Sequence, residues 1–120
     1  MKNIIVAKSA GFCFGVSRSV SMAEKLLEEG NAYSIGPLIH NNDVVSYLEE
    51  KGLSVIDTPE ELPADGRVII RSHGVSKEVY RSLKEKSAPV CDATCPKVKK
   101  IHELVSEASD AGRFVVIIGM

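Results

Sequence analysis

Two cysteines and two histidines share one kind of position in this 120-residue sequence, because each lies where an apolar run gives way to a helical pattern. Thiolates and imidazoles are common metal ligands. A lone histidine in such a loop is more often a structural residue than a ligand. Four residues of metal-binding types at equivalent points favour a binding site instead. These residues are Cys13, His40, His73 and Cys95.

Cys95 lies at the expected N-cap of a helix over residues 97–111. Pro96 suits the first helical position, since its missing N–H would be unpaired there in any case. A thiolate at the N-cap faces free backbone N–H groups and the positive end of the helix dipole, which favours the form that binds metals. An ordinary half-buried thiol is the alternative for a single cysteine. The apolar face of this helix comprises Val98, Ile101, Val105 and Ala108.

Cys13 lies between two nearby glycines, Gly11 and Gly15, which let the backbone turn tightly and approach a bound group. A tight turn with buried aromatic side chains is the alternative interpretation. Cys91 lies four residues before Cys95, a spacing used in some metal sites, but it falls inside a predicted strand. We therefore interpret Cys91 as a core residue.

Alternating strand and helix patterns position these residues. Apolar runs predict strands at residues 3–7, 32–35, 54–56, 68–70, 88–91 and 114–118. Helical spacing predicts helices over residues 16–27, 43–50 and 97–111 and one more after the cap Ser76. Successive βα units predict an α/β fold with a mostly parallel sheet and helices on both faces. Ligands bind beyond the carboxyl ends of such strands, so we expect all four residues at one edge of the sheet.

Composition narrows the class of protein. The sequence is 44% hydrophobic and 26% charged, which is typical of a globular domain. Its net charge of −1 and the absence of a basic block argue against a nucleic-acid partner. No apolar run is long enough to span a membrane, so we expect a cytoplasmic protein without a membrane partner. Three cysteines, an odd number, argue against a disulfide framework.

Four motifs, in this order, resemble the N-terminal motifs of the 4-hydroxy-3-methylbut-2-enyl diphosphate reductase family (IspH, also called LytB). They are Gly11-Phe12-Cys13-Phe14-Gly15-Val16, His40-Asn41 followed by Val44-Val45, Ser72-His73-Gly74-Val75, and Asp92-Ala93-Thr94-Cys95-Pro96 with Val98, Lys100 and His102. The resemblance implies an enzyme built from three similar α/β lobes. Residues 1–95 would form the first lobe, and residues 96–120 the start of a second, truncated one.

The resemblance also implies an activity and a cofactor. Enzymes of this family reductively remove the allylic hydroxyl group of their substrate, giving isopentenyl and dimethylallyl diphosphate in the final step of the methylerythritol phosphate pathway. They use a 4Fe-4S cluster held by three cysteines, of which Cys13 and Cys95 match two. His40 and His73 match residues that contact the substrate, chiefly its diphosphate. A ferredoxin or flavodoxin would donate the electrons.

The resemblance places the third cysteine and the proton-donating glutamate downstream of this sequence. We therefore expect no catalytic acid in this chain and little or no activity from it alone. Two other classes of protein stay open. One is a non-catalytic α/β module of the same fold, and the other is a small zinc or thiol-redox protein that uses Cys13, Cys91 and Cys95.

Overall fold

A four-stranded parallel sheet forms the centre of the computed structural model, which describes residues 2–119. Its strands lie in the order β2-β1-β3-β4, and in chain order they are β1 (Ala32–Ile35), β2 (Leu53–Ile56), β3 (Val68–Ile70) and β4 (Val90–Asp92). Ser34 of β1 lies opposite Val55 of β2 and Ile69 of β3, and Ile69 lies opposite Cys91 of β4. The predicted α/β fold with a parallel sheet is confirmed.

Helices alternate with these strands, and local signals explain where they begin and end. They are α1 (Phe14–Glu28), α2 (Asn42–Glu50), the short 3-10 helix η1 (Pro59–Glu61), α3 (Lys77–Glu85) and α4 (Pro96–Asp110). The side chain of Asn41 caps α2, and that of Ser76 caps α3. Gly30 has a φ of 132° just after α1, a conformation that glycine adopts without strain. Over the described residues, no helix is long and apolar enough to cross a membrane.

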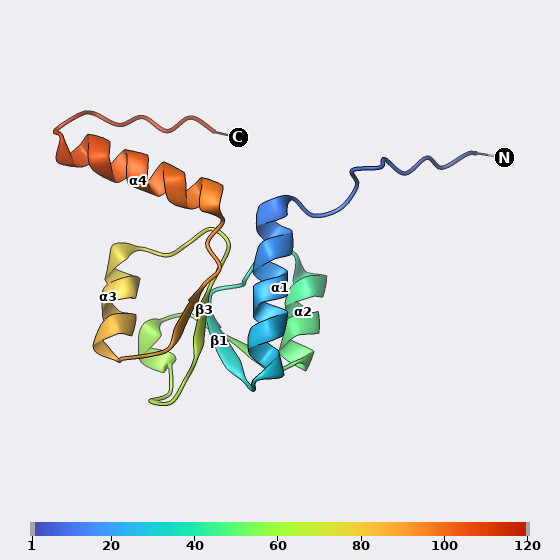
Figure 1. Ribbon diagram of the computed structural model, residues 1–120, viewed down its shortest axis with the longest axis horizontal. Coiled ribbons are helices and arrows are strands. Elements are labelled where there is room, and N and C mark those ends of the chain that lie inside the picture. The colour runs from blue at the N-terminus through green and yellow to red at the C-terminus, as the bar shows by residue number, and fades with distance from the viewer. Residues whose placement is uncertain (1, 120) are drawn as a thin grey trace.

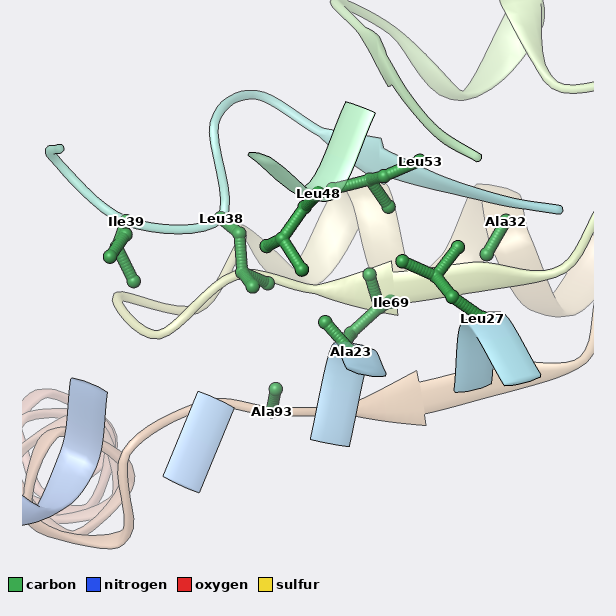
Figure 2. Close-up of a cluster of buried hydrophobic side chains, with 9 residues drawn as sticks. All are labelled: Ala23, Leu27, Ala32, Leu38, Ile39, Leu48, Leu53, Ile69 and Ala93. Atoms are coloured by element: carbon green, nitrogen blue, oxygen red, sulfur yellow. The ribbon is translucent and has the colours of Figure 1, made fainter. Parts of the chain in front are cut away.

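Successive side chains of β3 point to opposite faces of the sheet, so the hydrophobic core has two parts, one on each face. Ile69 points to the face that α1 and α2 cover, where it packs in a cluster of nine buried residues (Figure 2). Val68 and Ile70 point to the opposite face and pack with Leu83 of α3 and Leu62 after η1. Figure 1 shows α1 and α2 on one side of the sheet and α3 on the other. The prediction of helices on both faces is therefore confirmed.

Helix α1 buries a stripe of small residues on the sheet. We predicted an apolar face of Val16, Val20, Ala23 and Leu27, whereas the buried residues are Gly15, Ser19, Ala23 and Leu27. Val16 and Val20 are half-buried at the border of the same core. Small side chains at the first two buried positions let the N-terminal half of α1 lie close to the end of β4.

The predicted strands at residues 3–7 and 114–118 are wrong, because neither segment joins the sheet. Ile4 is 91% exposed and Ile118 is 93% exposed. A parallel strand needs a hydrogen-bonded neighbour and cover on both faces, and residues 2–119 offer neither to these segments. Both lie extended away from the sheet (Figure 1), and the radius of gyration is 17.0 Å against roughly 14 Å for a compact domain of this length.

Two further expectations need correction at the end of the chain. The predicted buried strand at residues 88–91 is observed as β4, which begins at Val90, and Val90 is 42% exposed because β4 is an edge strand of the sheet. The predicted helix after Pro96 is confirmed as α4, but none of its residues is buried, and Ile101 and Leu104 are half-exposed. Figure 1 shows α4 lying apart from the helices that cover the sheet.

The position of Ile69 predicts a large effect of its truncation. Ile69 is fully buried, so Ile69→Ala should lower the free energy of unfolding by about 2–5 kcal/mol in urea titrations. Ile5→Ala is the matched control, because Ile5 is 91% exposed and its truncation should change that free energy by less than about 0.5 kcal/mol. Equal losses from both substitutions would show that the core is not where the structure places it.

Candidate functional site

The chain leaves β1 and β3 in opposite directions, which creates a topological switch point between these two neighbouring strands. From β1 it runs through α2 to β2, and from β3 it runs through α3 to β4 on the other side. Because α2 and α3 cover opposite faces, the loops at residues 36–41 and 71–76 diverge at the carboxyl edge of the sheet. Ligands of open α/β sheets bind at such a point.

Backbone hydrogen bonds continue beyond the strand ends and tie three loops together. The N–H of Ser72 donates to the carbonyl oxygen of Leu38 at 3.1 Å, so the loop after β3 is bound to the loop after β1. The N–H of Cys95 donates to the carbonyl oxygen of Ser72 at 2.9 Å, which adds the turn after β4. The loops that carry His40, His73 and Cys95 therefore lie side by side in strand order.

His40 and His73 are in contact at the switch point. Their ring centroids lie 4.5 Å apart with an interplanar angle of 49°, and the Ser72 hydroxyl lies 3.4 Å from Nδ1 of His73. Partial burial lowers the pKa of His73, and the positive charges of His40 and Arg71 lower it further. Both residues remain exposed enough to reach a ligand. A neutral imidazole offers one N–H donor and one acceptor nitrogen.

Cys95 is held by the first turns of α1. The Ser19 hydroxyl donates to the carbonyl oxygen of Ala93 at 2.8 Å, and the Arg18 guanidinium donates to that of Thr94 at 3.2 Å. A Cβ atom at Gly15 would lie only 2.6 Å from Sγ of Cys95, so the thiol fits because residue 15 is a glycine. The turn after β4 is thus docked on the N-terminal half of α1.

Both candidate metal ligands occupy helix N-cap positions, which the sequence predicted for Cys95, whereas it placed Cys13 in a loop between a strand and a helix. Cys13 caps α1 and is exposed, whereas Cys95 caps α4 and is half-buried. Cys95 lies against Gly15, and Gly15 is two residues from Cys13. The fold therefore brings a segment at the start of the chain next to one more than 80 residues later.

A carboxylate organises the turn before Cys95. Oδ1 of Asp92 accepts hydrogen bonds from the N–H and the hydroxyl of Thr94, at 3.0 and 2.6 Å. Oδ2 accepts from the Tyr80 hydroxyl at 3.1 Å and from Lys99 at 3.4 Å. Burial would raise the pKa of Asp92, but the bonds from Thr94 and Tyr80 outweigh it and lower that pKa. Asp92 thus links α3, the turn and α4.

Cys91 precedes Asp92 in the sequence, but its side chain packs on the α1 side of the sheet. It packs on the core that α1 covers, beside Met22 and Leu26. Burial raises the pKa of the Cys91 thiol, and the charge of Asp92 raises it further. Both effects disfavour the thiolate that binds metals, in agreement with our interpretation of Cys91 as a core residue. Across residues 2–119, no three histidine, cysteine or acidic side chains are arranged to hold a metal ion.

Sequence reasoning missed three residues that shape the site. Ser19 and Arg18 bind the turn before Cys95, and Arg71 lies beside His73. One signal was available for Ser19, which is a polar residue four positions from Gly15 and from Ala23 on the buried stripe of α1. No local signal marks Arg18, because its partner Thr94 lies 76 residues away in the sequence. The approach of Arg71 to Gly36 likewise depends on the pairing of distant strands.

These features define an open parallel α/β lobe whose chemically active side chains gather at the carboxyl edge of its sheet. The model of the family described as "LytB protein" matches residues 4–120, and the chain belongs to this family. The family resemblance of the sequence motifs is thereby confirmed.

Named relatives agree with this assignment. The chain is 45% identical over 119 residues to the 4-hydroxy-3-methylbut-2-enyl diphosphate reductase of Clostridioides difficile (strain 630), covering 98% of this chain and 43% of the relative. It is 50% identical over 117 residues to the protein of the same name from Geobacter metallireducens, covering 97% and 41%. The chain thus spans less than half the length of these curated relatives.

Two solved structures share the fold. The E-1-hydroxy-2-methyl-but-2-enyl-4-diphosphate reductase from Plasmodium falciparum matches with a TM-score of 0.82 at 31% identity, over 87% of this chain and 33% of that one. A structure of (E)-4-hydroxy-3-methyl-but-2-enyl diphosphate reductase, the terminal enzyme of the non-mevalonate pathway, matches with a TM-score of 0.79 at 45% identity. It covers 100% of this chain and 43% of that one.

The close approach of Cys95 to Gly15 predicts that Gly15→Ala changes the stability in the opposite direction to most glycine-to-alanine substitutions in helices. Glycine to alanine within a helix normally stabilises it by about 0.5–1 kcal/mol. Gly15→Ala should instead destabilise the fold by about 1–3 kcal/mol and speed alkylation of Cys95, because the new methyl group displaces the thiol. Gly119→Ala is the control, since nothing lies within 4 Å of that site. A stabilising effect of Gly15→Ala would contradict this packing.

The histidine contact predicts a pH dependence. Because folding lowers the pKa of His73 from its ordinary value of about 6.5, the folded state binds fewer protons at this site. The stability from His73 is therefore complete above pH 6.5 or so and declines as the pH falls below it. His40→Ala should raise the pKa of His73, as measured by NMR titration, while Lys84→Gln on α3 should not. An unchanged titration in His40→Ala would refute the coupling.

Proposed function

We propose that this chain is the N-terminal part of a 4-hydroxy-3-methylbut-2-enyl diphosphate reductase. The enzyme would remove the allylic hydroxyl group of its substrate and give isopentenyl and dimethylallyl diphosphate, the final step of the methylerythritol phosphate pathway. Membership of the LytB family and the names of the relatives support this proposal. The structural observation that carries it is the docking of the Cys95 turn on α1, the helix whose N-cap is Cys13.

Cys13 and Cys95 would be two ligands of a 4Fe-4S cluster. The donor chemistry fits, because cysteine thiolates are the usual ligands of such clusters. Gly15 leaves room for Sγ of Cys95, and both thiols are free and reach the surface at helix N-termini. When bound, the cluster supplies electrons and an iron site for the hydroxyl group that is removed. The family's remaining cysteine ligand would come from outside this chain.

His40 and His73 would bind the diphosphate of the substrate. Their rings lie together at the switch point, where the capped N-termini of α2 and α3 also carry free backbone N–H groups. Helix N-termini and imidazole N–H donors suit phosphate oxygens. The neutral state favoured for His73 leaves one ring nitrogen able to donate, and the hydroxyl of Ser72 is placed to orient the ring through Nδ1.

The complete reaction would need groups beyond this chain. We assign residues 1–95 to the first lobe of a three-lobed enzyme and residues 96–120 to the start of the second, in keeping with the half-exposed apolar side chains of α4. The proton-donating glutamate would belong to the rest of the enzyme. We propose a cytoplasmic enzyme that receives electrons from a ferredoxin or flavodoxin, and we expect this chain alone not to turn over substrate.

The structure offers no support for the alternative zinc or thiol-redox protein. That function needs Cys13, Cys91 and Cys95 together, but Cys91 packs against Met22 and Leu26 on the α1 side of the sheet. A non-catalytic module of the same fold differs from the proposed enzyme only in whether the two remaining cysteines bind a cluster. The experiment that follows separates these two.

A chimeric enzyme tests the proposed function. This chain would replace the matching N-terminal segment of the Geobacter metallireducens reductase, to which it is 50% identical. The anaerobically purified chimera should show iron–sulfur absorption and reduce the substrate. Cys13→Ser and Cys95→Ser should each lower both by at least about tenfold, because hydroxyl oxygens bind such iron poorly.

Cys91→Ser is the matched control in the same chimera and should leave absorption and turnover nearly intact, since this half-buried thiol packs against the core. Loss of the cluster in Cys91→Ser together with its retention in Cys95→Ser would overturn the ligand assignment. A colourless chimera that binds no iron, beside an active relative, would favour the non-catalytic module.

A further inference from the structure

Arg71 spans the switch point between β1 and β3. It is the first residue after β3, and its guanidinium lies over Gly36, the first residue after β1. A Cβ atom at Gly36 would lie 2.8 Å from Nη1 of Arg71. Gly36 also has a φ of 72°, in the left-handed region that favours glycine. Residue 36 therefore provides a notch for the guanidinium as well as a turn.

Hydrogen bonds hold both sides of this arrangement. Nε of Arg71 donates to the carbonyl oxygen of Gly74 at 3.1 Å, which anchors the side chain to the loop that carries His73. The N–H of Gly36 donates to Ile56 at 2.8 Å, and its carbonyl oxygen accepts from the Ser34 hydroxyl at 2.9 Å. The half-buried guanidinium is thus positioned by the folded chain before any ligand binds.

Among residues 2–119, the charge of Arg71 has no counter-charge in an ion pair. The three ion pairs of the described chain involve Arg67, Lys99 and Lys100, and none includes Arg71. Only Nε is hydrogen-bonded there, so the two Nη groups keep their donors. A planar guanidinium with paired free donors matches a carboxylate or phosphate group in bidentate fashion. A positioned cation without a counter-charge therefore indicates an anion site.

His73 is close enough for the charge of Arg71 to lower its pKa, after the effects of burial and of His40. The guanidinium and the two imidazoles also lie on the same two neighbouring loops after β1 and β3, where Arg71 contacts Gly36 and Gly74 and the histidine rings contact each other. One guanidinium group and two imidazole N–H donors suit an anion that has several oxygen atoms and more than one negative charge.

We propose that Arg71 is a further anion-binding residue, which contacts a phosphate group of the diphosphate that His40 and His73 bind. The inference rests on the proposed function of the histidine pair. It adds Arg71 as the charged residue of the same diphosphate site. It also favours a diphosphate over a monophosphate, because a diphosphate offers the guanidinium and the two ring donors more oxygen atoms and a larger charge.

Titration calorimetry with inorganic pyrophosphate and the 120-residue chain tests this assignment at low salt. Arg71→Gln should weaken binding by about 10- to 100-fold, as expected when bonds to a charged group are lost. Arg71→Lys keeps the charge but not the fork, so it should lose affinity less and should remain folded. Arg81 is exposed on α3, and Arg81→Gln changes the net charge equally, so it should alter binding by less than about twofold.

His40→Ala and His73→Ala in the same series separate the two hypotheses. Weaker binding by the histidine variants with unchanged binding by both Arg71 variants would overturn the role of Arg71 and leave the histidine site intact. Weaker binding by the Arg71 variants alone would support Arg71 and reject the histidines. No pyrophosphate binding by the unsubstituted chain would overturn both. Equal affinity for monophosphate and pyrophosphate would refute the proposed specificity.

Discussion

The docking of helix α1 on the turn after β4 is the interaction on which the site depends. Ser19 is fully buried there, and its hydroxyl bonds to the carbonyl oxygen of Ala93. Removing the hydroxyl, as in Ser19→Ala, would take this bond from the carbonyl oxygen of Ala93, at a cost of about 1–3 kcal/mol if that oxygen is left unpaired. The same contact sets the distance between the N-terminus of α1 and that of α4. It thereby links the two segments that carry the N-cap residues Cys13 and Cys95, although more than 80 residues separate these cysteines in the sequence.

Local patterns sufficed to predict the helices and the inner strands. Helix α2 has its cap at Asn41 and α3 has its cap at Ser76, so each element carries its own boundaries. The segments at residues 3–7 and 114–118 are as apolar as the inner strands, yet they form no strand. A strand exists only with a neighbour, and pairing depends on residues elsewhere in the chain. The same dependence explains why β4, at the edge, is more exposed than its composition indicated.

The site was predictable in part. A parallel sheet places every strand's carboxyl end at one edge, which sufficed to gather His40, His73 and Cys95 there. The strand order β2-β1-β3-β4, which the sequence did not reveal, decides that the loops after β1 and β3 are neighbours. The contact between the histidine rings and the reach of Arg71 to Gly36 follow from that order. The roles of these residues stay predictions, whereas their positions are now known.

The backbone bonds that run past the strand ends have a thermodynamic consequence. Because Ser72 is bonded to Leu38 on one side and to Cys95 on the other, these loop residues open only when the sheet beneath them opens. The conformational entropy of arranging the site is therefore lost during folding and not during recognition. A ligand that arrives at this edge meets loops that are already bonded to one another. The binding free energy then depends mainly on the contacts that the ligand makes, because little conformational entropy is lost in ordering the loops.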